Sequence, residues 1–125
     1  MIRAIHHATF LSDELARSRA FYEGVLGLQA DPSRPAMGFE GVWYRLHSGQ
    51  QIHLMGLPNP PTDPQRPAHG GRDRHLALAV GDLPALMARL EGAGIPYTLS
   101  RSGRRALFCR DPDGNALEFI GTAEI

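Results

Sequence analysis

The sequence predicts an α+β protein built from two tandem βαβββ modules. The first observation is an internal repeat: His7–Gly24 aligns without a gap on His75–Gly92 after a shift of 68 residues, and Trp43–Gly56 aligns on Phe108–Gly121 after a shift of 65. The second is that each half reads as a strand, a helix and three further strands. Such self-similarity is typical of a duplicated supersecondary unit.

The first module is expected over residues 1–57. Ser12 is predicted to cap its helix with the side-chain oxygen, and Gly27 to end it, because glycine accepts the left-handed conformation that follows a helix. The expected strand, helix and three strands are Ile2–Leu11, Ser12–Gly27, a short strand near Leu28, Val42–Leu46 and Gln51–Gly56.

The second module is expected over residues 73–125. Asp82 is predicted to cap its helix, with Pro84 tolerated in the first turn, and the D-P-D-G-N segment to form the last hairpin turn. The expected elements are Arg74–Val80, Asp82–Gly94, Tyr97–Leu99, Arg105–Cys109 and Ala116–Ile120. Residues 58–72 hold five of the ten prolines and are expected to be an extended connector without secondary structure.

Composition limits the classes of function. A length of 125 residues predicts one domain, 1–125, and the 13 basic and 13 acidic residues cancel, which gives no electrostatic reason to expect nucleic acid or an anionic membrane as partner. With no apolar run near the length of a spanning helix and no signal-peptide pattern, a cytoplasmic protein is expected. The single cysteine, Cys109, excludes an internal disulfide and is expected to be a small buried hydrophobe.

The repeat superposes two pairs of potential metal ligands. His7 aligns with His75, and His53 aligns with Glu118. In all four strands the neighbouring residues are apolar, so strand alternation turns these four side chains to one concave face. A single histidine is more often structural than a ligand, but the coincidence of both pairs in register favours a divalent metal such as Fe, Zn, Ni, Mn or Co.

Other polar residues receive simpler interpretations. His6 is expected to point to the other face, and His47 and His69 are expected to be solvated. Six arginines of the second half form another group. They are expected to be solvated at the surface of the protein, and the alternative is that one or two of them bind a carboxylate or phosphate of a substrate. The S-R-S-G-R-R segment is the favoured place; the six are Arg72, Arg74, Arg101, Arg104, Arg105 and Arg110.

Three motifs resemble the vicinal oxygen chelate superfamily: H-A-T-F, R-H-L-A-L-A-V-x-D-L and D-P-D-G-N-A-L-E-F. That superfamily includes glyoxalase I, methylmalonyl-CoA epimerase, fosfomycin-resistance thiol transferases, extradiol dioxygenases and bleomycin-resistance proteins. The resemblance covers essentially the whole chain. It implies a curved, mixed eight-strand sheet around a metal held by His7, His53, His75 and Glu118. It also implies a homodimer whose sites combine modules of both chains.

The resemblance does not select one reaction. Glyoxalase I and the epimerase carry Glu or Gln where this chain has His53, whereas His7, His75 and Glu118 match the two-histidine, one-carboxylate set of the dioxygenases and thiol transferases. Thr9 matches a substrate-contacting threonine of the thiol transferases. The bleomycin-resistance proteins lack the metal set.

The functional expectation is a metal-dependent enzyme that acts on a small oxygen-chelating substrate by lyase, isomerase, thiol-transferase or ring-cleaving dioxygenase chemistry. Two alternatives remain open: a non-catalytic small-molecule binder of the bleomycin-resistance type, and a closed structural site with four protein ligands. Glu118 and His53 are the expected catalytic residues. The expected substrate-binding residues are Thr9, Trp43, Tyr44, Arg105 and Phe108, with core packing as the alternative for each aromatic ring.

Overall fold

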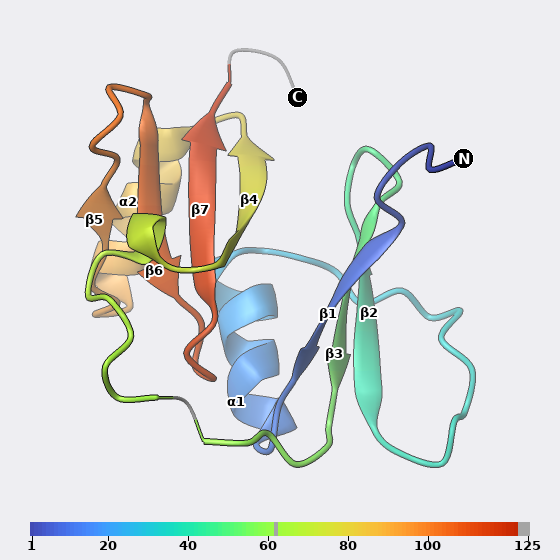
Figure 1. Cartoon of the computed structure of the whole chain (residues 1–125). Coiled ribbons are helices and arrows are strands. Elements are labelled where there is room, and N and C mark those ends of the chain that lie inside the picture. The colour runs from blue at the N-terminus through green and yellow to red at the C-terminus, as the bar shows by residue number, and fades with distance from the viewer. Residues whose placement is uncertain (62, 123–125) are drawn as a thin grey trace. The chain divides into compact units, whose positions relative to one another are not determined.

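The computed structural model describes residues 1–61 and 63–122 (Figure 1). The chain forms two compact units, Met1–Pro60 and Pro61–Ile125, and the boundary lies inside the proline-rich connector. Each unit holds one mixed sheet, of three strands in the first and four in the second. The predicted α+β class is confirmed, whereas one continuous eight-strand sheet stays a prediction.

The first unit has its strands in the spatial order β1-β3-β2. β1 runs parallel to β3, and β2 runs antiparallel to it. Its elements are β1 (His7–Leu11), α1 (Leu15–Arg19), the π-helical turn η1 (Ala20–Val25), β2 (Gly41–Arg45) and β3 (Gln51–Met55).

The helix of the first unit differs from its prediction at the start. Ser12 does not cap it: its hydroxyl is buried 2.8 Å from the Ser18 hydroxyl, and Glu14 occupies the cap position without a side-chain hydrogen bond. The helix therefore begins two residues later than predicted, after Glu14. The predicted end is correct, since Gly27 has φ +76°.

The strand predicted near Leu28 does not form. This segment makes only an isolated bridge between Ala30 and Tyr44. The described residues therefore contain seven strands, one fewer than predicted. Tyr44 is fully buried, stacks on Tyr22 at 5.9 Å between ring centroids, and donates its hydroxyl proton to Glu23 Oε2 at 2.8 Å. Burial, and then this carboxylate, raise the pKa of Tyr44.

The second unit has its strands in the order β4-β7-β6-β5. The connector was predicted to lack secondary structure, but its last residues form a short 3-10 helix in which Gly70 is buried. The elements are η2 (Gly70–Arg72), β4 (His75–Val80), α2 (Leu83–Gly92), β5 (Thr98–Leu99), β6 (Ala106–Arg110) and β7 (Ala116–Gly121).

Helix α2 follows the predicted signals. The Asp82 side chain accepts a hydrogen bond from the Ala85 amide at 3.0 Å, and Gly94 has φ +70° just after the helix. α2 contacts β7 and lies behind its sheet in Figure 1. The core of this unit holds the buried leucines of α2 together with central residues of β6 and β7: Leu83, Leu86, Leu90, Leu107, Leu117 and Phe119.

Two further predictions for this unit are confirmed. Cys109 is 4 % exposed, and burial raises the pKa of its thiol to about 12. The turn before β7 is tied by Asp111, whose Oδ1 accepts from the amides of Asp113 and Asn115, each at 2.9 Å. Gly114 supplies the positive φ of +86° that this turn requires.

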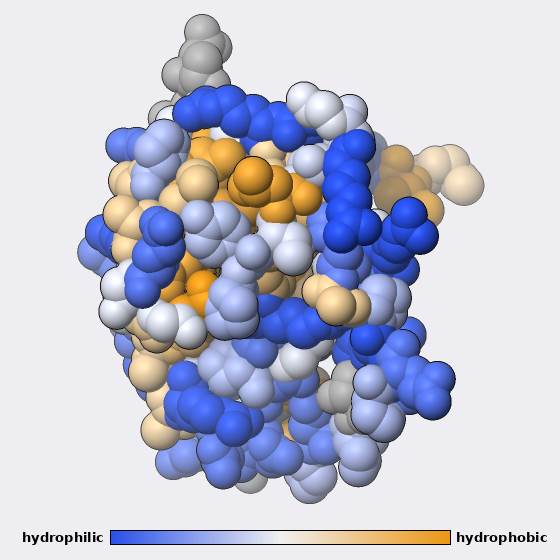
Figure 2. All heavy atoms as spheres, turned by 90° about the vertical axis from the view of Figure 1, so that its left-hand side faces the viewer, coloured by the Kyte–Doolittle hydropathy of each residue, from blue (hydrophilic) through white to orange (hydrophobic). Residues whose placement is uncertain are grey.

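Figure 2 views the side on which β5 lies, where hydrophilic side chains border a smaller hydrophobic area. Leu99 of β5 is 59 % exposed. Within residues 1–61 and 63–122, no helix is both long enough and apolar enough to cross a bilayer.

Candidate functional site

The predicted metal ligands form two pairs, one in each unit. The first is His7 on β1 and His53 on β3. The strands pair in parallel with Thr9 opposite His53, which places the two imidazoles on the same face. Their rings stack with centroids 4.1 Å apart and an interplanar angle of 15°.

His53 is the more enclosed member of this pair. It is 9 % exposed, and the indole of Trp43 covers its second face at 4.5 Å and 10°. Its Nε2 lies 2.7 Å from Gln51 Oε1, so Nε2 carries the proton and Nδ1 the lone pair. Burial, followed by the nearby His7, His6 and Arg34, lowers the pKa of His53 to about 4. His53 is therefore neutral near pH 7, the form that binds metals and accepts protons.

His6 lies closer to the first pair than predicted. Its Nδ1 is 2.9 Å from His7 Nδ1, and the two rings meet edge to face at 5.1 Å. β1 begins at His7, so strand alternation does not govern the residue before it.

The second pair is His75 on β4 and Glu118 on β7. These strands are also parallel neighbours, with Ala77 opposite Glu118. His75 Nε2 lies 3.1 Å from Glu118 Oε1, and His75 Nδ1 lies 2.8 Å from the carbonyl oxygen of Asp73. A carbonyl only accepts, so Nδ1 must donate to it. The Nε2 lone pair of a neutral His75 would then face a carboxylate oxygen, and this contact requires a proton or another cation.

The two pairs occupy equivalent positions of the two sheets, as the repeat predicted. His53 faces Thr9 on one side and Trp43 on the other, and Glu118 faces Ala77 and Phe108 in the same register. The pairs belong to different units. Within residues 1–61 and 63–122, no three His, Cys, Asp or Glu side chains are placed so that they could hold one metal ion.

A cavity of ≈ 310 Å³ lies beside the second pair. Phe108 meets the rings of both His75 and His69 edge to face, at 5.2 and 5.0 Å. The cavity's other residues come from η2 and the β5–β6 loop. The full lining is His69, Gly71, Arg72, His75, Ser100, Arg101, Ser102, Arg104, Phe108 and Glu118.

The predicted substrate-binding residues separate into three groups. Trp43 and Phe108 lie against the ligand pairs, and Thr9 is exposed beside His53. The prediction that Tyr44 binds substrate is wrong, because its side chain is buried on the opposite face of β2, against Tyr22 and Glu23. Arg105 is not part of the cavity lining, whereas its neighbour Arg104 is.

The roles of three residues near the site were not predicted from the sequence. His69 was expected to be solvated but is 8 % exposed, with Nδ1 bonded to Thr98 Oγ1 at 2.7 Å. Gln51 holds His53, and its position two residues away on the same strand face was the available signal. The backbone carbonyl of Asp73 orients His75, and no side-chain pattern reports such a contact.

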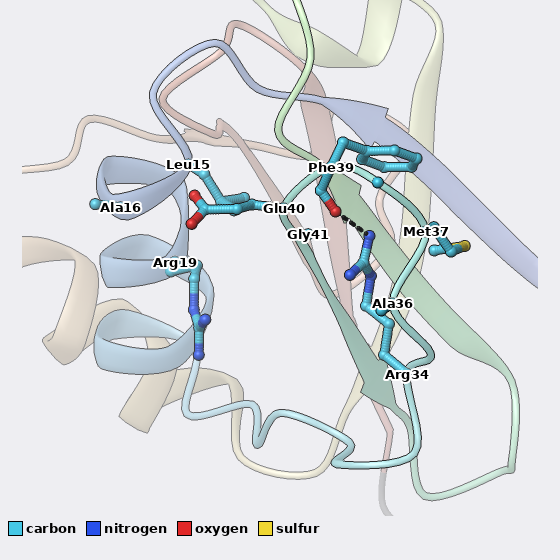
Figure 3. A pocket seen from close by; sticks show the side chains of 10 residues that line it. Leu15, Ala16, Arg19, Arg34, Ala36, Met37, Phe39, Glu40 and Gly41 are labelled. Atoms are coloured by element: carbon cyan, nitrogen blue, oxygen red, sulfur yellow. Dashed lines mark hydrogen bonds between the residues drawn. The ribbon is translucent and has the colours of Figure 1, made fainter.

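Another cavity, of ≈ 590 Å³, lies in the first unit between α1 and the segment before β2 (Figure 3). The Arg34 guanidinium points at the Phe39 carbonyl there, with Nη2 at 3.2 Å. Glu40 is the one titratable carboxylate in its described lining, which contains no histidine. This cavity therefore offers no pair of metal-binding side chains.

Comparison with known proteins shows the family of the chain. Residues 4–119 match the family model described as Glyoxalase/Bleomycin resistance protein/Dioxygenase superfamily. The chain belongs to this superfamily. It is 35 % identical over 127 residues to the uncharacterized protein YaeR of Escherichia coli, covering 94 % of this chain and 95 % of YaeR.

Two further similarities widen this comparison. The chain is 30 % identical over 122 residues to Glyoxylase I 4 of Arabidopsis thaliana, covering 94 % of this chain and 70 % of that protein. Its fold matches a variant of the fosfomycin-resistance protein FosX from Listeria monocytogenes, solved with Mn(II) and 1S,2S-dihydroxypropylphosphonic acid. That match has a TM-score of 0.74 and 19 % identity, and covers 99 % of this chain and 96 % of the other.

Proposed function

We propose that this chain is a divalent-metal-dependent enzyme of the superfamily that acts on a small substrate with two neighbouring oxygen atoms. The observation that carries the proposal is the contact of His75 Nε2 with the buried Glu118 carboxylate at 3.1 Å, while Nδ1 is committed to the Asp73 carbonyl. A backbone carbonyl that fixes the tautomer and orientation of an imidazole is a recurrent support of metal-ligating histidines.

The donor set fits such an ion. His7, His53, His75 and Glu118 would hold it, and three imidazoles with one carboxylate suit Fe, Zn, Ni, Mn and Co. When bound, the metal supplies Lewis-acid polarisation of substrate oxygens or, if it is iron, chemistry with dioxygen. FosX, which shares the fold, was solved with Mn(II).

The protein's own residues prepare the site for proton transfer. Glu118 is 3 % exposed and uses Oε1 to contact His75, so its second oxygen is available to take up or return a substrate proton. His53, held neutral and bonded to Gln51 through Nε2, keeps an accepting Nδ1. Trp43 stacks on His53, and Phe108 packs against His75, so both rings keep their orientation.

The first test is Mn(II) binding by calorimetry to protein freed of metal with EDTA. Wild-type protein is expected to bind about one Mn(II) per chain, and His75→Gln to weaken binding by about tenfold or more. His47→Gln, at an exposed histidine of the β2–β3 turn, is the matched control and should bind as wild type does. Equal affinity of His75→Gln and wild type would refute the proposed site, and absence of Mn(II) binding by wild type would favour a metal-free binding protein.

The partner that we propose is a second copy of the chain, with each site assembled from the first module of one chain and the second module of the other. β1 and β4, which carry His7 and His75, each lie at the edge of a sheet, and an open edge is available for pairing.

Mixing His7→Ala with Glu118→Ala protein tests this arrangement. In mixed dimers one of the two sites then regains all four ligands, so about a quarter of all sites recover Mn(II) binding. Ligands contributed by a single chain predict no recovery.

A further inference from the structure

The cavity beside His75 and Glu118 is rich in positive charge. Arg72 enters it from η2, and Arg101 and Arg104 enter it from the β5–β6 loop. Glu118 is the one carboxylate in its described lining, and that group already contacts His75. The cavity thus holds three permanent cations against one anion.

In the described part of the chain, these three arginines take part in no ion pair. Within residues 1–61 and 63–122, none of the three guanidiniums lies within 4.0 Å of a carboxylate. The nearby Arg66 and Arg110 differ, since both bind Asp73, at 2.7 and 2.9 Å. The arginines that form ion pairs with Asp73 are therefore different residues from those that line the cavity.

The other lining residues contribute polar groups and small side chains to the cavity. Ser100 and Ser102 hydroxyls lie 2.8 Å apart in the β5–β6 loop, and Gly103 turns this loop with φ +83°. A Cβ on Gly71 would lie 2.7 Å from His69 Nε2, so a larger residue there would force the His69 ring to shift. Burial, followed by Arg101 and Arg72, lowers the pKa of His69, which is the effect expected of a positive field inside the cavity.

We infer that this cavity binds an ionised oxyacid group of the substrate, a carboxylate or a phosphoryl or phosphonyl group, through Arg72, Arg101 and Arg104. Guanidinium forks match the paired oxygens of these anions, and a concave surface lined by one sign of charge concentrates ions of the other sign. The inference rests on the proposed function and narrows its substrate class to small organic acids, because the same cavity also borders His75 and Glu118.

The test measures binding of inorganic phosphate and of acetate to the chain of residues 1–125 by calorimetry at low ionic strength. The protein is freed of metal with EDTA and then dialysed into a metal-free buffer without chelator, so neither anion can bind through a metal and EDTA carboxylates do not compete for the cavity. A failure of metal binding would leave this result unaffected. Wild type is expected to bind at least one of the two anions saturably. A tighter phosphate complex identifies the phosphoryl class, and a tighter acetate complex identifies the carboxylate class.

Substitutions of single arginines test whether the anion binds in this cavity. Arg101→Gln and Arg104→Gln are each expected to weaken the preferred anion by about tenfold, because each removes a charge-assisted hydrogen bond. Arg74→Gln is the matched control, since Arg74 is an exposed arginine of the same unit outside the cavity lining, and it should change affinity less than about twofold. Circular dichroism confirms that each variant is folded. Absence of saturable binding in wild type, or equal weakening in all three variants, would overturn the inference.

Discussion

Acid should destabilise the first unit through His53. The folded state holds the pKa of His53 at about 4, whereas the ordinary value is 6.5. Between these values the unfolded chain binds more protons than the folded one, so stability falls as pH falls from about 6.5 to about 4. The ring is 9 % exposed, which leaves little solvent to screen this effect. Linkage gives a loss of about 2 kcal/mol in the free energy of unfolding between pH 7 and pH 5.

The assay is urea unfolding at pH 7 and pH 5 in EDTA, followed by the fluorescence of Trp43, the single tryptophan, which stacks on His53. His53→Gln removes the titrating group and should reduce the difference between the two pH values by about 2 kcal/mol. His47→Gln removes an exposed histidine and should leave this difference unchanged. If wild type and His53→Gln lose the same stability on acidification, the assignment of a buried, neutral His53 is incorrect.

Four substitutions test the rest of the packing by urea unfolding. Leu117→Ala removes a fully buried side chain of β7 and should cost about 2–5 kcal/mol, whereas Leu99→Ala at a 59 % exposed position should cost less than about 0.5 kcal/mol. Asp82→Ala removes the cap of α2 and should cost about 1 kcal/mol; no loss would mean that the cap does not contribute. Tyr44→Phe leaves Glu23 without its buried donor and should cost about 1–3 kcal/mol, and an unchanged urea midpoint would contradict that hydrogen bond.

The repeat made the strand pairing of the ligands predictable. Residues that align in two copies of one supersecondary unit must occupy equivalent register positions, and Thr9 opposite His53 and Ala77 opposite Glu118 do so. Strand alternation alone should have excluded Tyr44 from the pocket, since its neighbour Trp43 lies on the His53 face and adjacent strand residues point to opposite faces.

Other features depend on contacts that have no sequence period. His6 precedes β1, so its approach to His7 follows from loop geometry. His69 is enclosed because Phe108 and Thr98, both distant in sequence, meet it in the fold. The helix begins after Glu14 rather than after Ser12, whose hydroxyl is buried against that of Ser18. Local patterns carry no information about such long-range or buried partners.

In the proposed function, Glu118 helps to hold a divalent metal. The most direct test is the metal content of untagged protein by mass spectrometry, for wild type, Glu118→Ala and the control Glu91→Ala, which removes an exposed carboxylate of α2. We expect about one equivalent of divalent metal per chain in wild type and Glu91→Ala, and loss of most of it in Glu118→Ala. The element present then distinguishes oxygen chemistry from Lewis-acid chemistry. Failure of wild type to retain any metal after reconstitution with iron, zinc, nickel, manganese and cobalt would contradict the account.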